Sequence, residues 1–124
     1  MELPDVITAY LDGYNSLDVD AMLACLGEDV VFLNVADGQV NAETRGRAAF
    51  ADLARVGAQA FTERRQHVSD AILMTGRAML KIDYTAIVAA DLPNGWKEGQ
   101  QLAFEGRSYI EWRGDAITLI VDEM

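Results

Sequence analysis

The feature of this sequence that most constrains its fold is a change in the spacing of apolar residues near Phe61. Before this point apolar residues recur at helical spacing, and after it they alternate with polar residues, as in strands that bury one face. Four successive strands joined by short turns predict an antiparallel meander. The alternating segments, separated by glycine-containing turn signals, cover residues 61–74, 77–90, 101–113 and 116–123.

Three helices are predicted in the first half of the chain. The first covers residues 3–14, where Tyr10 and Tyr14 share one apolar stripe and so face inward. A short second helix follows Asp18, a residue type that suits the N-cap position. The third runs from about residue 46 to about residue 58, in an alanine-rich stretch with an apolar side.

The segment DVVFLNVADG, residues 29–38, predicts a strand with apolar residues on both faces. Asn34 is the exception, because its primary amide shares a face with Val30 and Phe32. The amide can hold a carbonyl or hydroxyl group of a small ligand, since it both donates and accepts hydrogen bonds. It can equally be satisfied by a neighbouring backbone group or an ordered water. The sequence leaves both alternatives open.

Two later strands have readable faces, and polar groups lie on the apolar face of each. Tyr84 lies on the apolar face of the first, and Ser108 on that of the second. Gly106, in the middle of the same strand as Ser108, predicts a bulge or a bend. Bending lets an antiparallel sheet wrap around helices and leave a cavity between them. The element order ααβαββββ therefore predicts an α+β fold, a cone with a pocket at its wide end.

Two stretches resemble a known superfamily. AYLDGYNSLDVDAMLACLGEDVVF, residues 9–32, and TRGRAAFADL, residues 44–53, resemble the N-terminal pattern and third helix of the superfamily of nuclear transport factor 2, ketosteroid isomerase and the SnoaL-type polyketide cyclases. The resemblance covers nearly the whole chain and implies a cystatin-like fold, a curved antiparallel sheet around about three N-terminal helices. It implies little about activity, because this scaffold hosts isomerases, cyclases, dehydratases, epoxide hydrolases and binding modules.

The resemblance also bears on the chemistry of ketosteroid isomerases, which needs an aspartate base, a tyrosine donor and a protonated aspartic acid. Tyr10 falls at the position of the donor tyrosine, Asn34 at that of the base and Ser108 at that of the second acid. Asparagine cannot accept a proton at neutral pH, and a serine hydroxyl is a much weaker acid than a carboxylic acid. The resemblance therefore implies a SnoaL-like protein without ordinary ketosteroid isomerase activity.

Two residues are candidate catalysts of proton transfer. His67 is the only imidazole in the chain, and an unperturbed histidine titrates near neutral pH. Asp37 directly follows the strand that carries Asn34, close enough in sequence to reach a cavity mouth and act as a base. The alternatives are a solvated strand histidine, because the segment around His67 is polar, and an Asp-Gly turn at Asp37.

A set of polar and aromatic residues forms the candidate ligand site. Their rings and hydroxyl groups suit a small apolar or aromatic molecule with a carbonyl group, whereas Phe32 and Phe104 are assigned to the core. The leading hypothesis is a small-molecule binder, whose enzymatic form is a cofactor-independent isomerase, cyclase or dehydratase. The alternative is a non-catalytic dimeric module that binds a ligand or a protein. The candidate contacts are Tyr10, Tyr14, Asn34, Tyr84, Ser108 and Trp112.

Composition limits the partners. With 20 acidic and 10 basic residues the formal charge is −10, which repels phosphate backbones and anionic membranes. One cysteine and one histidine leave no Cys/His metal site, and no cofactor is expected. We expect a single cytoplasmic domain of residues 1–124, without a leader or an apolar run of about 20 residues. We also expect a homodimer through the exposed sheet face, with Ile87, Ile117 and Ile120 as apolar contacts.

Overall fold

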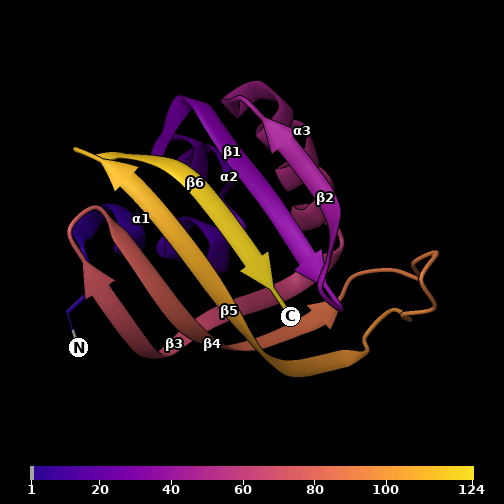
Figure 1. Ribbon diagram of the computed structural model, residues 1–124. Helices are drawn as coiled ribbons and strands as arrows, with labels where there is room; N and C mark the ends of the chain where they lie inside the picture. Colours follow the sequence, from indigo (N-terminus) through magenta and orange to yellow (C-terminus); the bar gives the residue numbers. More distant parts are fainter. Residues whose placement is uncertain (1) are drawn as a thin grey trace.

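A computed structural model describes residues 2–124 and shows three helices against one face of a curved sheet (Figure 1). The helices are α1 (Asp5–Asn15), α2 (Val19–Leu23) and α3 (Arg47–Gln59). The strands are β1 (Leu26–Ala36), β2 (Gln39–Arg45), β3 (Phe61–Met74), β4 (Arg77–Val88), β5 (Gln101–Arg113) and β6 (Ala116–Glu123).

The six strands form a single sheet in the order β2-β1-β6-β5-β4-β3. The strand that comes last in the chain thus lies inside the sheet, between β1 and β5. β1 and β6 run parallel, and every other neighbouring pair runs antiparallel. The sheet is therefore mixed, and it stays open because β2 and β3 are edge strands.

The structure confirms the predicted α+β class and the helix-covered curved sheet, and it adds one strand. β2 was not expected, because five of the seven residues of QVNAETR are polar, although Val40, Ala42 and Thr44 alternate with them. It forms because it pairs along β1 as an exposed edge strand, from Val31 opposite Arg45 to Ala36 opposite Gln39. The element order is therefore ααββαββββ.

Alternate residues of the strands divide between the helix-covered face and the outer face of the sheet. In β4, Leu80, Ile82 and Tyr84 are buried, whereas Lys81 and Asp83 are exposed. This is the alternation that the sequence predicts for a sheet covered on one side. The core accordingly lies between the helices and the inner face.

Two of the expected dimer contacts belong to this core. Ile117 and Ile120 have no exposed surface, so the expectation that they lie on the outer face was wrong. They are three residues apart, and strict alternation would place them on opposite faces. The register of the β5–β6 pair shifts between Glu111 and Trp112, where the ladder steps from Leu119 to Ile117, and this irregularity lets both isoleucines face inward.

The helix ends follow the sequence signals. The side chain of Asp18 caps α2, since its Oδ1 accepts a hydrogen bond of 3.0 Å from the backbone N–H of Ala21. α3 begins after Gly46, which has a φ of 90° and therefore a conformation that favours glycine. No helix among residues 2–124 is long and apolar enough to cross a membrane.

Gly106 allows a close approach between strands and does not mark a bulge. The β4–β5 register runs without a shift through Gly106, which lies opposite Ile82, so the expected bulge was wrong. A Cβ atom at Gly106 would lie 2.6 Å from the backbone oxygen of Glu123 and 2.6 Å from Cγ of Met124. The end of β6 and the residue after it thus occupy the space that a side chain would need.

Replacing Gly106 with alanine should therefore lower the free energy of unfolding by about 1–3 kcal/mol, because the backbone of β6 must move. A matched control is Gly57→Ala in α3, where the nearest atom to a new Cβ is Nη1 of Arg64 at 3.9 Å. This change should stabilise the protein by up to about 1 kcal/mol through helix propensity. Urea unfolding of both variants measures the two effects, and equal stabilities would contradict the close approach at Gly106.

Candidate functional site

A row of polar side chains crosses the inner face of the sheet. Asp122 of β6 lies opposite Asn34 of β1 on one side and Ser108 of β5 on the other. Oγ of Ser108 donates a hydrogen bond of 2.7 Å to Oδ1 of Asp122. Sequence reasoning identified Asn34 and Ser108 but missed the carboxylate between them.

Asp122 has an unusual protonation equilibrium. Burial raises the pKa of its carboxyl from 3.8 to about 6, although the hydrogen bond from Ser108 acts in the opposite direction. No side chain or backbone group of residues 2–124 donates a hydrogen bond to its second oxygen, Oδ2. A carboxyl group that titrates near neutral pH and keeps one oxygen free can accept or deliver a proton.

Two tyrosine hydroxyls meet beside this carboxylate. The hydroxyl of Tyr14 in α1 donates a hydrogen bond of 3.0 Å to the hydroxyl of Tyr84 in β4. Burial is the largest cause that raises the pKa of both phenols, so both stay protonated at neutral pH. The hydroxyl of Tyr84 accepts from Tyr14 and has its own proton available for another partner.

Arg64 holds Tyr14 in place. Its side chain is buried on the inner face of β3, its Nε donates to the backbone oxygen of Tyr14 at 2.8 Å, and its guanidinium carbon lies 3.7 Å from the centre of the Tyr14 ring. The described residues contain no carboxylate within ion-pair distance of this guanidinium. The cation is stabilised by the ring and by the carbonyl end of α1. It also acts to lower the pKa of Tyr14 and Tyr84.

The polar groups border a small cavity. Its volume is about 20 Å³, which is enough for one water molecule. Asp122 and the two tyrosines line it together, and Gly106 lies at its wall. The full lining is Tyr14, Gln66, Ile82, Tyr84, Gly106, Arg107, Asp122 and Met124.

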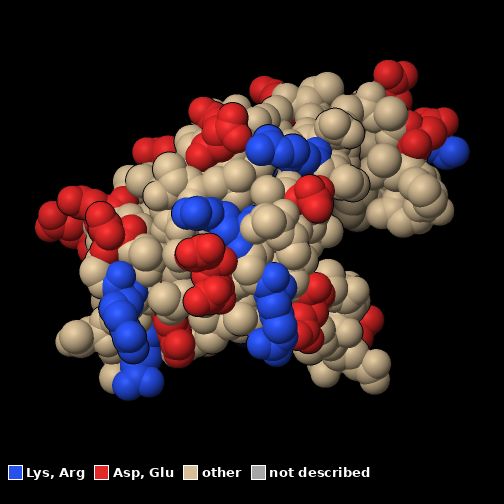
Figure 2. All heavy atoms as spheres, turned by 90° about the horizontal axis from the view of Figure 1, so that it is seen from above, with Lys and Arg blue, Asp and Glu red and all other residues tan. Residues whose placement is uncertain are grey.

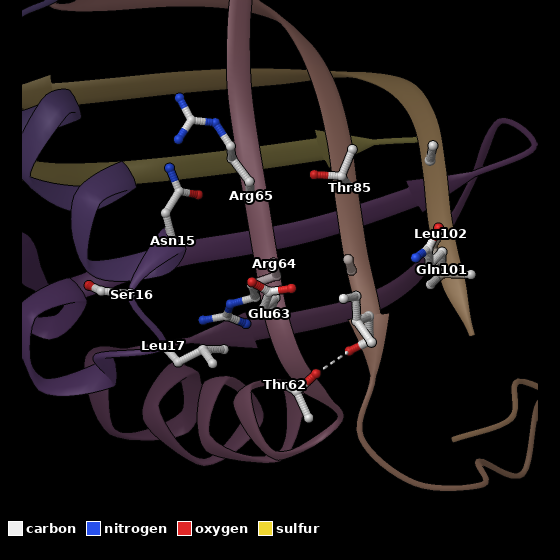
Figure 3. A pocket seen from close by; sticks show the side chains of 13 residues that line it. Asn15, Ser16, Leu17, Thr62, Glu63, Arg64, Arg65, Thr85, Gln101 and Leu102 are labelled. Carbon is white, nitrogen blue, oxygen red and sulfur yellow. Dashed lines mark hydrogen bonds between the residues drawn. The ribbon is translucent and has the colours of Figure 1, made fainter. Parts of the chain in front are cut away.

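A larger hollow of about 810 Å³ lies elsewhere and is open to solvent. Figure 3 shows it at the α1–α2 link and across β3, β4 and β5, with Asn15, Arg65 and Thr85 around it. The hydroxyl of Thr62 is engaged there with the backbone oxygen of Ile87 at 3.5 Å. Neither Asp122 nor a tyrosine lines this hollow, so the carboxyl group with the raised pKa and the paired hydroxyls belong to the smaller cavity.

The two candidate catalysts lie outside the cavity. His67 is exposed on the outer face of β3, opposite Asp83, because its neighbour Gln66 points inward. Asp37 is exposed in the turn between β1 and β2, where its φ of 52° and that of 75° at Gly38 fit a tight hairpin turn. The prediction that either residue reaches the cavity was wrong, and the alternative for each, solvated histidine and turn aspartate, describes its position.

Four of the expected ligand contacts lie in or beside the polar row. Tyr14 and Tyr84 line the cavity, and Ser108 is buried against Asp122. Asn34 shares the row, but its amide donates a 2.8 Å hydrogen bond to Oδ1 of Asn41 across the β1–β2 hairpin. Its partner is thus another side chain, which neither alternative from the sequence had named.

Tyr10 and Trp112, the other two expected ligand contacts, do not line the cavity. Tyr10 is 3% exposed and lies behind the cavity lining, near enough that the charge of Asp122 contributes, after burial, to a raised pKa of its phenol. Trp112 lies at the far end of β5, where its backbone N–H donates to the oxygen of Gly76 and its ring packs on the core. Trp112 is therefore not part of the cavity.

The charge on the surface is mixed. On the face drawn in Figure 2, basic side chains are interspersed with acidic ones and do not gather into one positive patch. Exposed ion pairs such as Arg107 with Glu123, 3.4 Å apart, are consistent with this pattern. The described part of that face therefore offers no continuous positive surface of the kind that binds phosphate backbones.

The position of Asp122 predicts a pH-dependent stability. Because its folded-state pKa is raised, ionisation disfavours the folded state, so this destabilisation is absent well below pH 4 and complete above pH 6. Asp122→Asn keeps an acceptor for Ser108 and should raise the free energy of unfolding at pH 8 by roughly 1–3 kcal/mol, but not at pH 3.5. Urea unfolding at both pH values measures the difference. Asp37→Asn is the control, and an equal gain there would contradict the burial of Asp122.

Comparison with known proteins identifies one family over most of the chain. Residues 7–120 match the family model described as the SnoaL-like domain. No curated protein has significant sequence similarity to the chain.

Many solved structures share the fold. A protein of Catenulispora acidiphila with a ketosteroid isomerase-like fold, crystallised with trimethylamine, has a TM-score of 0.79 at 16% identity, over 98% of this chain and 85% of its own. A candidate polyketide cyclase of Xanthomonas campestris has a TM-score of 0.74 at 24% identity, over 96% and 87%. An LEH-like epoxide hydrolase of M. tuberculosis has 0.74 at 21%, over 95% and 78%. At these identities the likeness shows a shared fold alone.

Proposed function

The chain belongs to the family of SnoaL-like domains, and from this premise we propose that it binds a small apolar molecule with a carbonyl group and transfers a proton on it without a cofactor. The observation that carries the proposal is one carboxyl, Asp122, beside the paired hydroxyls of Tyr14 and Tyr84 in a single cavity. Two structural neighbours bear the names of small-molecule enzymes, polyketide cyclase and epoxide hydrolase, which supports it.

Asp122 is the proposed general base. Its free Oδ2 takes a proton from the carbon next to the carbonyl group, and the electrons of that C–H bond move to the carbonyl oxygen. The hydroxyl of Tyr84 donates a hydrogen bond to this oxygen as negative charge develops. The bond that Tyr84 accepts from Tyr14 makes it a better donor. Asp122 then returns the proton to the same or another carbon.

The polar row explains how acid–base chemistry is compatible with asparagine at position 34 and serine at position 108. The carboxylate is supplied by Asp122, which lies between these two residues across neighbouring strands. Ser108 fixes the orientation of the carboxylate by occupying Oδ1, which leaves Oδ2 without a donor among residues 2–124. Asparagine at position 34 and serine at position 108 thus remove the base and the second acid of the ketosteroid isomerase pattern. The site nevertheless contains one carboxyl group.

A pH-dependent exchange reaction tests this proposal. In D₂O the protein should catalyse exchange of the methyl protons of 2-acetonaphthone, with kcat/KM rising with pH through about 6 as Asp122 ionises. Asp122→Asn should lose at least about 100-fold, and Tyr84→Phe roughly tenfold. Proton NMR follows the exchange. His67→Ala should keep full activity, and a loss there that equals the loss in Asp122→Asn would refute the assignment.

A second proposal concerns the outer face of the sheet, which we infer to be the interface of a homodimer. Val121 lies between Leu33 and Tyr109 across neighbouring strands, and Leu119 is two residues away on the same face. All four are only partly buried in the single chain, and Ile87 is likewise partly buried on this face. This apolar surface replaces Ile117 and Ile120, the β6 contacts that the sequence predicted. A second copy of the chain fits it by symmetry.

Introducing a charge on this surface should separate the copies. Val121→Lys should shift the protein from dimer to monomer in sedimentation equilibrium, because a lysine at the centre of the contact would be desolvated. Val56→Lys is the matched control, since Val56 is exposed on α3 at the opposite side and should leave the mass unchanged. A monomeric wild-type protein at high micromolar concentration would rule out the interface.

A further inference from the structure

A cluster of aromatic rings extends from the cavity of Asp122 to the surface. The rings of Tyr84 and Phe104 are parallel within 3° at a centroid distance of 5.3 Å, and Phe61 meets Tyr84 edge-on at 6.5 Å. Tyr84 belongs to both parts, because its hydroxyl bonds Tyr14 at the cavity and its ring stacks on Phe104. Stacked and edge-on rings of this kind offer ring faces and edges to a ligand, which suits a planar ring that stacks on one of them.

The indole of Trp96 covers the outer end of this cluster. Its ring lies 6.5 Å from Phe104 at an interplanar angle of 27°, and 6.3 Å from Phe61 at 48°. Trp96 comes from the segment 89–100, which joins β4 to β5 and projects beyond their ends in Figure 1. The cavity beneath holds only about one water molecule, so a ligand of any larger size requires a side chain to move.

The segment that carries Trp96 is weakly tied to the rest of the protein. Within residues 2–124, every hydrogen bond and ion pair made by residues 90–99 joins them to one another or to Val88 and Gln100 at the base of the segment. Gly95 and Gly99 have positive φ values, and no atom lies within 4 Å of where their Cβ atoms would be. The segment is held against the sheet by apolar contacts of Leu92 and Trp96. Residues 90–98 can therefore swing about this base without breaking a hydrogen bond to the sheet or helices, whereas the N–H groups of Ala89 and Gly99 are bonded to Ala60 and Val88.

We propose that Trp96 is a lid residue whose indole occupies the place where a planar conjugated ring of the ligand stacks on Phe104. This rests on the proposed function, and it adds the ring-binding subsite, the ligand class and the residue that must be displaced. A ligand with its ring on Phe104 and Tyr84 would extend its carbonyl group toward the cavity of Asp122. The ring of the ligand thus takes the place of the Trp96 indole on Phe104, and the indole moves into solvent.

Binding of 2-acetonaphthone, a planar aromatic ketone, tests the lid. Because the ligand no longer competes with the indole, Trp96→Ala should bind the probe about tenfold more tightly than wild type in calorimetry. Trp96→Phe, with a smaller ring, should fall between the two. Trp112→Phe is the control, since Trp112 lies at the far end of β5 and should leave the affinity unchanged. Far-UV circular dichroism checks that each variant is folded.

A spectroscopic readout locates the movement. The chain has two tryptophans, so labelling with 5-fluorotryptophan gives two fluorine resonances, assigned by the Trp112→Phe variant. The probe should move the Trp96 resonance to its solvent-exposed position and leave that of Trp112 in place. An unmoved Trp96 resonance, or probe binding by Trp96→Ala that is equal, weaker or absent, would overturn the lid. Proton exchange on the probe is measured separately. If the lid test fails while exchange is intact, only the lid is refuted. If exchange fails while the lid test succeeds, only the proposed proton transfer is refuted.

Discussion

The pairing of the last strand between β1 and β5 is the constraint on which the site depends. β6 runs parallel to β1, and parallel neighbours need a long connection, here supplied by β2, α3 and the three strands β3 to β5. This register sets Asp122 between Asn34 and Ser108 on the helix-covered face. The carboxylate, its orienting hydroxyl and the tyrosines of α1 and β4 meet only when both ends of the chain are in place.

The site contains ionisable groups that are less stable in the fold than they would be in water. Burial raises the pKa of Asp122 to about 6, which means that its ionised form is destabilised in the fold. Arg64 is likewise buried without a carboxylate partner in the described structure, and it is stabilised by the Tyr14 ring and the end of α1. Such groups are common at functional sites, where reactivity is gained at some loss of stability. The cavity holds the Asp122 carboxyl beside Tyr84, whose ring stacks on Phe104, and the proposed ligand class rests on these two features.

Much of the fold follows from the sequence, for physical reasons that also explain the errors. The change of period near Phe61 predicts the meander because a half-buried strand must alternate. β2 escaped prediction because most of this edge strand is polar and only Ala42 and Thr44 are half-buried. Gly106 was assigned to a bulge or a bend, and the bulge was wrong, since sequence alone does not show that residues 123 and 124 pass over it. Tyr14, Tyr84 and Ser108 were identified because polar groups stood out on apolar faces.

The central carboxylate was missed for a different reason. Asp122 is followed by Glu123 near the end of the sequence, where acidic residues look like solvated side chains. One signal was available, because Asp122 follows the buried Ile120 by two residues and therefore shares its face. The sequence could not show which face of the strand His67 occupies, since the polar segment around it alternates weakly. His67 was considered as a catalyst because of its residue type alone.

The most direct test of this account is a carbon-13 NMR titration of the Asp122 carboxyl group, assigned by its absence in Asp122→Asn. The account predicts a titration midpoint near pH 6, well above the value of about 3.9 for an unperturbed aspartate. A midpoint below about pH 4.5 would show an ordinary solvated carboxylate, and it would contradict both the burial of Asp122 and its role as the base.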